Sequence, residues 1–179
     1  MLKNEQIIIE SASHPLIDDV KRLFFESFPE EERRPWDDFI RKMEMQEGGF
    51  SLHAYLTPEK RLAGFITLWD LDDFRYAEYL ATAPEMRGNG LGAKIIRREI
   101  EESPKPLLLE VEMPETGEMA SRRINFYRRN GFIAHKDIFY EQPPYSEGLP
   151  SVRLMLMTTA PIKDADATIR NLHSRVYGA

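Results

Sequence analysis

Two spacings of hydrophobic positions alternate along the chain and predict a definite order of helices and strands. Apolar residues recur every three or four positions, as on one face of an amphipathic helix, in residues 16–28, 35–46, 91–100 and 119–130. Short alternating or continuous apolar runs predict strands at residues 6–10, 50–56, 62–68, 76–82, 106–111, 132–140 and 152–157. A last helix is expected over 162–176. The predicted order is β-α-α-β-β-β-α-β-α-β-β, followed by that helix.

No repeat, low-complexity tract or long linker interrupts this order, so residues 1–179 are expected to form a single domain. The net charge is −6, and lysines and arginines are interspersed with acids rather than gathered in the basic stripe of a nucleic-acid-binding protein. No stretch approaches the roughly 20 apolar residues of a membrane-spanning helix, and the start of the chain lacks the pattern of a signal peptide. We therefore expect a cytoplasmic protein, as a monomer or homodimer, with no nucleic-acid or membrane partner.

Cysteine is absent and the four histidines are scattered, which limits the chemistry that the chain can perform. Without a thiol there is no thiolate nucleophile and no cysteine-ligated metal, and the histidines show no metal-ligand spacing. We expect no metal site.

The most informative segment is residues 87–92 (RGNGLG), a glycine-rich turn between a predicted strand and a predicted helix. Backbone N–H groups at a helix start are unpaired and lie at the positive end of the helix dipole. Glycines allow a tight turn and let phosphate oxygens approach those donors. The segment therefore predicts a pyrophosphate site.

Two classes of phosphate-binding protein fit this segment differently. Gly88-x-Gly90-x-x-Ala93 matches a loose dinucleotide fingerprint, with Glu110 or Glu112 placed as the ribose-binding acid. That interpretation, a nicotinamide-dependent oxidoreductase, requires repeated βαβ units. The predicted antiparallel strands before the turn, and the single clear helix with a hairpin after it, do not provide them.

The alternative motif is Arg87-x-x-Gly90-x-Gly92, and with it the chain resembles the GNAT superfamily of N-acetyltransferases, whose cofactor motif follows the fourth strand. The run at 122–132 (RRINFYRRNGF) is similar to the second signature of that family, a helix ending in F-Y-x-x-x-G-F. The resemblance covers residues 5 to 159. It implies an α/β fold of the acyl-CoA N-acyltransferase type: a central mixed, mostly antiparallel sheet flanked by helices, with a parallel strand pair splayed around the cofactor.

The resemblance implies acetyl-CoA as the acetyl donor and assigns its contacts residue by residue. Backbone groups of one strand pair with the pantetheine arm, namely Leu80, Ala81 and Thr82. The turn and helix start hold the pyrophosphate, through Arg87, Gly88, Asn89, Gly90, Leu91, Gly92 and Ala93. Where the family often has an asparagine early in the second-signature helix, this chain has Glu118 or Ser121, and Asn125 is the candidate to replace it.

Acetyl transfer to an amine needs a base, because an amine with a pKa of about 10.4 is mostly charged at neutral pH. Glu78 is the first candidate, expected on the same face of the strand as Leu80, and Glu110 and Glu112 are its rivals. Tyr127 resembles the general acid of the family. An N–H of the cofactor strand, that of Ala81, is the candidate donor for the developing oxyanion.

The expected acceptor is a primary amine of a small molecule or peptide, attacked directly since the chain has no cysteine for an acyl-enzyme. Since proteins of this fold usually admit the acceptor there, we expect the amine to lie against the predicted helix at 35–46 and the loop at 142–145. The alternative class of function is a non-catalytic acyl-CoA-binding or regulatory module of the same fold.

Overall fold

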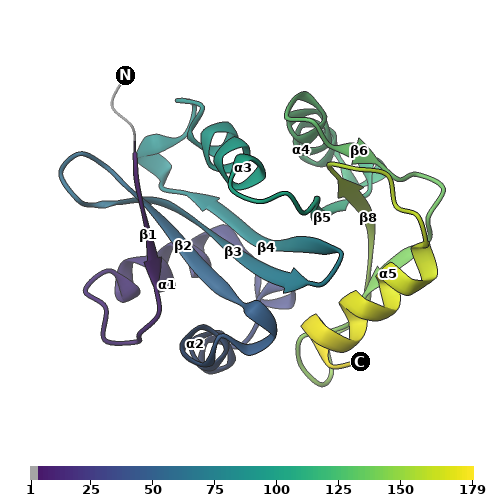
Figure 1. Ribbon diagram of the computed structural model, residues 1–179, viewed down its shortest axis with the longest axis horizontal. Coiled ribbons are helices and arrows are strands. Elements are labelled where there is room, and N and C mark those ends of the chain that lie inside the picture. The colour runs from purple at the N-terminus through teal and green to yellow at the C-terminus, as the bar shows by residue number, and fades with distance from the viewer. Residues whose placement is uncertain (1–3) are drawn as a thin grey trace.

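The computed structural model describes residues 4–179, in which one mixed sheet carries helices on both faces (Figure 1). The strands lie in the order β1-β2-β3-β4-β5-β8-β6, and β7 also pairs with β8. Their bounds are β1 Glu5–Ile9, β2 Ser51–Leu56, β3 Leu62–Leu71, β4 Phe74–Thr82, β5 Leu107–Glu112, β6 Ile133–Ala134, β7 Tyr140–Gln142 and β8 Val152–Thr158. The helices are α1 Ile17–Ser27, α2 Trp36–Met45, α3 Leu91–Glu101, α4 Glu118–Arg129 and α5 Ala165–Leu172. A C-terminal turn, His173–Tyr177, continues α5.

The predicted fold class is confirmed, with one parallel pair, β4–β5, inside an otherwise antiparallel sheet. Two hydrophobic cores lie on opposite faces of this sheet. Phe24 of α1, Phe39 of α2 and Leu172 of α5 belong to the first core. Ile95 of α3 and Ile124 of α4 belong to the second. We call the two faces the α1/α2 face and the α3/α4 face.

The β4–β5 pair separates soon after it begins. Only Arg75↔Leu107 and Tyr76↔Leu108 are in register, whereas β5 continues to pair with β8 as far as Glu112. Within the described part of the chain, the rest of β4 therefore pairs with no strand on its β5 side. This divergence opens the sheet, as the resemblance implied.

A β-bulge in β4 changes the face on which Glu78 lies. Thr67 pairs with Tyr79 and Leu68 with Ala77, so Glu78 is the extra residue. Glu78 contacts Arg34 and Trp69 on the α1/α2 face, whereas Leu80 packs on the α3/α4 face. The expectation that Glu78 and Leu80 share a face is wrong, because simple alternation does not hold across a bulge.

Two predicted elements differ from those in the structure. The strand expected over 132–140 is interrupted by a turn at Lys136–Asp137, and its two parts, β6 and β7, pair separately with β8. The last helix begins only at Ala165, because the Asp164 side chain accepts a hydrogen bond from the Ala167 N–H at 3.0 Å and caps it. Over residues 4–179, none of the helices has the length and apolar content to cross a membrane.

Candidate active site

The glycine-rich turn places α3 so that its first N–H groups are open. Gly88 and Gly90 have φ of 82° and 74°, left-handed conformations that favour glycine. Gly90 is the N-cap of α3, no side chain caps the helix, and its first turn contains no acid. The N-terminus of α3 therefore offers unpaired donors and the positive end of a helix dipole to an anion.

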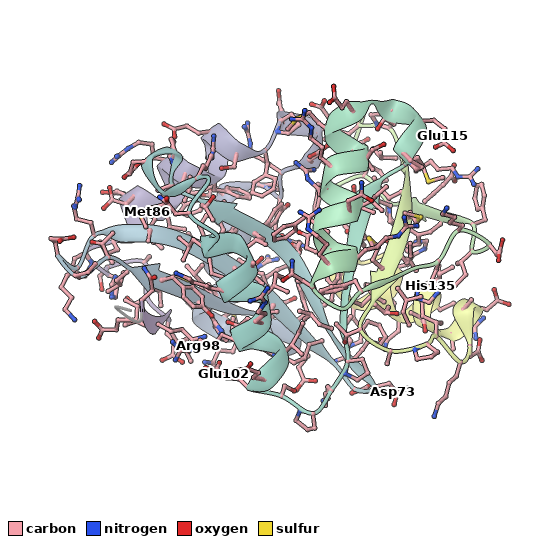
Figure 2. All side chains as sticks on the ribbon, turned by 90° about the horizontal axis from the view of Figure 1, so that it is seen from above. Asp73, Met86, Arg98, Glu102, Glu115 and His135 are labelled. Carbon is pink, nitrogen blue, oxygen red and sulfur yellow. The ribbon has the colours of Figure 1, made fainter. Side chains whose placement is uncertain are left out.

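A groove of about 490 Å³ lies in front of this helix start, with its lining from β4, α3 and α4 on the α3/α4 face. Met86, one of the lining residues, is labelled in Figure 2. The groove is lined by Leu80, Thr82, Met86, Arg87, Gly88, Gly90, Leu91, Gly92, Ala93, Met119, Arg122, Arg123, Phe126 and Tyr127. Three of these are arginines, from the turn and from α4. Their charge and the free N–H groups suit a diphosphate ligand.

The space in front of the turn is not needed by the protein's own side chains. A Cβ at Gly88 or Gly90 would meet nothing within 4 Å, and one at Gly92 would lie 3.5 Å from the Phe126 ring, an ordinary contact. Packing therefore does not require glycine at 92. A ligand lying close to the backbone would, and this is the role that the motif predicts for it.

The edge of β4 that faces the gap presents alternate backbone groups. The N–H groups of Tyr79 and Ala83 bond toward β3, to Thr67 Oγ1 at 3.1 Å and to the Ala63 carbonyl at 2.8 Å. Since N–H directions alternate along a strand, the Ala81 N–H also points toward β3, and those of Leu80 and Thr82 point into the gap. The oxyanion role expected for the Ala81 N–H is therefore wrong, and the Leu80 N–H is the donor in the right direction.

Tyr127 of α4 lies at the bottom of the groove and is only 9% exposed. Within residues 4–179 its hydroxyl makes no hydrogen bond to another side chain or to the backbone. Burial raises its pKa to about 12, with the charge of Arg123 acting in the opposite direction. The phenol therefore stays protonated at neutral pH and can donate to a group in the groove.

Three residues of the expected cofactor set lie outside this lining: Ala81, Asn89 and Asn125. Asn89 and Asn125 are exposed, whereas Ala81 is buried. Conversely, the motifs did not predict four residues of α4 that line it: Met119, Arg122, Arg123 and Phe126. Their spacing of three and four positions places them on one face of a helix, which is the signal that could have found them.

Glu110 lies on the opposite, α1/α2 face, where β4 and β5 begin to diverge. Continuing the register past Tyr76↔Leu108 brings it level with Glu78 across the gap. Its Oε1 accepts hydrogen bonds from the hydroxyls of Tyr140 at 3.0 Å and Tyr177 at 2.7 Å, while Oε2 is buried and has no partner among residues 4–179. Burial raises the pKa of Glu110 to about 7, although the phenol hydrogen bonds oppose the rise.

Glu78 is occupied by structural partners. Its side chain is 0% exposed and forms a two-pronged pair with Arg34, at 3.1 and 3.2 Å, and it accepts a bond from Trp69 Nε1 at 3.1 Å. Arg34 is also buried and bonds to Asp38 and to the Val176 carbonyl. Both oxygens of Glu78 thus accept hydrogen bonds, whereas in Glu110 only Oε1 does so within residues 4–179.

Replacing Glu78 by glutamine should lower the free energy of unfolding by about 3 kcal/mol, because it removes the charge that balances a buried guanidinium. Urea unfolding measures this. Asp19→Asn is the matched control, since it breaks the exposed pair with Arg22 and should cost under about 1 kcal/mol. Equal losses in the two variants would contradict the structural role of Glu78.

Glu112, the third carboxylate expected near the site, lies two residues further along β5. It is close to Glu32 in the connection between α1 and α2, where burial and then the charge of Glu112 raise the pKa of Glu32. A recess of about 320 Å³ lies nearby on the same connection, lined by Phe25, Glu30, Arg33, Arg34, Pro35, Trp36, Ser146, Glu147 and Leu149. It lies between the start of α2 and the β7–β8 loop, close to where the acceptor is expected.

One group of side chains away from the groove has the spacing of metal ligands: His53, Glu99 and Glu102. Glu99 is already bonded by Arg75 at 3.0 Å and by the hydroxyl of Tyr55 at 2.8 Å, and His53 lies 2.8 Å from it. A guanidinium on the same carboxylate disfavours a cation there. We interpret His53 and Glu99 as part of a buried polar network that fixes α3 to the sheet, with Glu102 exposed at its edge.

Comparisons with known proteins agree with this geometry. The Acetyltransferase (GNAT) family matches residues 15–132. The solved structure of "Putative acetyltransferase from GNAT family" of Bacteroides thetaiotaomicron is 34% identical, with a TM-score of 0.89, over 98% of this chain and 99% of that one. A Bacillus subtilis acetyltransferase solved in complex with CoA is 13% identical and has the same fold, with a TM-score of 0.60 over 89% of this chain and 100% of that one.

Among curated proteins, "Putative acetyltransferase YjbC" of Bacillus subtilis (strain 168) is 35% identical over 74 residues, which are 41% of this chain. The aligned part spans 38% of that protein's length. The family match over most of the chain and the solved relative over nearly all of it lead to the same conclusion as the glycine turn and the diverging strands. The chain belongs to the GNAT family of N-acetyltransferases.

Proposed function

We propose that the protein transfers the acetyl group of acetyl-CoA directly to the nitrogen of a primary amine. The observation that carries this proposal is the gap between β4 and β5, which has an uncapped helix start on one face and, on the other, a carboxylate oxygen unpaired within residues 4–179. A donor entering along the groove and an amine entering from the α1/α2 face would meet in that gap.

Different residues of the groove suit different parts of acetyl-CoA. The N–H groups from Gly88 to Ala93, with Arg87, Arg122 and Arg123, suit the phosphates, and the Leu80 and Thr82 backbone suits an amide-containing arm. That a fold neighbour was solved with CoA supports the assignment. When bound, acetyl-CoA supplies an activated thioester carbonyl and a thiolate leaving group.

The protein's own groups would then handle two protons and one developing charge. Glu110 Oε2 takes the proton of the amine, for which a pKa of about 7 is well matched to neutral pH. The Leu80 N–H donates to the oxyanion. Tyr127 gives its proton to the departing sulfur, since a buried phenol remains protonated at that pH. The alternative base is Glu78, as expected from the sequence, and the variants Glu110→Gln and Glu78→Gln distinguish the two.

Changing Tyr127 to phenylalanine should lower kcat roughly 10- to 100-fold while leaving acetyl-CoA affinity near wild type. The side chain has no hydrogen bond to lose within residues 4–179, so the fold and the groove should be unaffected. Steady-state kinetics and a calorimetric titration check the two parts. An unchanged kcat would remove Tyr127 from the mechanism.

The activity itself is tested by thiol release from acetyl-CoA with a panel of polyamines, amino acids, aminoglycosides and peptides, and with mass detection of the acetylated product. The proposal predicts one acetyl group added to one class of amine. Tight acetyl-CoA binding with no product from any amine would instead favour a non-catalytic acyl-CoA-binding module.

A further inference from the structure

The C-terminal turn carries a tyrosine into the site on the α1/α2 face. The Tyr177 hydroxyl lies 2.7 Å from Glu110 Oε1, to which it donates, and it accepts from Gln142 Nε2 at 2.8 Å. It is also 3.0 Å from the hydroxyl of Tyr76, and its ring packs on Tyr145 with centroids 5.2 Å apart. These contacts join the end of the chain to the strand that carries the candidate base.

The C-terminal turn is held by several contacts besides that of Tyr177 with Glu110. Val176 is buried in the first core, and its carbonyl accepts a bond from Arg34 at 2.9 Å. Arg175 pairs with Asp72 in the β3–β4 connection, and His173 Nε2 lies 2.9 Å from the Glu141 carbonyl of β7. The turn therefore bridges both sides of the β4–β5 gap. It lies outside residues 15–132, where the family match ends.

The contacts treat the two oxygens of Glu110 differently. Both phenol donors, Tyr140 and Tyr177, bond to Oε1, and none of the residues 4–179 bonds to Oε2, which is buried. Two hydrogen bonds to the same oxygen restrict rotation of the carboxylate, since turning it would break both. The oxygen that remains available is Oε2.

We propose that Tyr177 is a positioning residue for acetyl transfer: its hydroxyl holds Oε1 of Glu110, so that Oε2 stays free to take the proton of the incoming amine. This inference rests on the proposed role of Glu110 as the base. Tyr140 shares the task from β7. The C-terminal turn thus contributes a side chain to the site around Glu110.

The titratable and charged groups around Glu110 determine the pH readout. They are Tyr76 and Glu78 on β4, Tyr140 on β7, and Tyr177, with Tyr145 near Tyr177. Hydrogen bonds from the phenols favour the ionised carboxylate and lower its pKa against the effect of burial. Losing one donor should therefore raise the pKa of Glu110.

The test is the pH dependence of kcat in wild type, Tyr177→Phe and Tyr55→Phe. The last variant is the matched control, because it removes a buried phenol bond to a different carboxylate, Glu99, at 2.8 Å. Tyr177→Phe should move the acid limb upward by about one pH unit, with recovery at high pH. Tyr55→Phe should leave the limb in place. A uniform loss at every pH, or an unmoved limb, overturns the inference.

A second readout separates this inference from the proposed function. Titration of the Glu110 carboxyl by ¹³C NMR, in wild type and Tyr177→Phe, follows the contact without any turnover. An upward shift of the Glu110 pKa confirms the contact, and an unchanged pKa overturns it. Failure of the proposed function would appear elsewhere, as a wild-type rate in Glu110→Gln or as no acetylated amine.

Discussion

Glu110→Gln is expected to lower kcat by about 10²- to 10⁴-fold, the range that a positioned general base contributes. Glutamine keeps the shape of the side chain and an oxygen for the two phenol donors, but it cannot accept a proton. Because Glu110 acts in its ionised form and burial raises its pKa to about 7, the wild-type rate should rise as the pH increases through about 7. That limb should be absent from the variant.

Two carboxylates serve as controls for this change. Glu112→Gln alters the next acid on the same face of β5 and should keep the limb near pH 7 and most of the rate. Glu78→Gln tests the alternative base; it should lower stability, because Arg34 loses its partner, but retain the pH limb. If Glu78→Gln abolishes the limb and Glu110→Gln leaves it, the roles are reversed and our assignment of the base is wrong.

The second large effect is expected at the glycine turn. Gly90→Glu should weaken acetyl-CoA binding at least about 100-fold, corresponding to about 2.7 kcal/mol. A side chain at a φ of 74° strains the turn by about 1–2 kcal/mol. Its carboxylate would also stand at the N-terminus of α3, where the phosphates are expected, and repel them.

Gly131→Glu separates these effects from a general loss of fold. Gly131 has a φ of 94°, and a Cβ there would meet nothing within 4 Å, so strain and added charge are similar. It follows α4 and does not line the groove. Calorimetric titration should give wild-type affinity for Gly131→Glu. Equal weakening in the two variants would show that the turn at residues 87–92 is not the phosphate site.

Local patterns in the sequence were sufficient to predict the fold and the glycine turn that lines the groove. Gly88 and Gly90 adopt the left-handed backbone of the turn before α3, and the FY…GF run marks the end of α4; both signals depend on neighbouring residues. Arg122 and Arg123 lie on the same face of α4 as Met119 and Phe126, a spacing that is visible in the sequence. The residues that line the groove therefore belong to short sequence segments, whose patterns can be recognised without knowing the fold.

The other half of the site depends on contacts between distant segments, and there the sequence was less informative. The bulge that turns Glu78 toward Arg34 is visible only from the pairing of β3 with β4. The phenols that bond Glu110 come from residues 30 and 67 positions away, on β7 and the C-terminal turn. No periodicity relates such residues, so Glu110 could be proposed but its environment could not.

Calorimetric titration of the wild-type protein with acetyl-CoA, and with NADH as the competing ligand class, shows whether the groove before α3 holds acetyl-CoA. We predict binding of one acetyl-CoA per chain and no binding of NADH. A folded protein that gives no heat with acetyl-CoA would rule out the groove as an acetyl-CoA site, and binding of NADH in its place would identify the turn as a dinucleotide site.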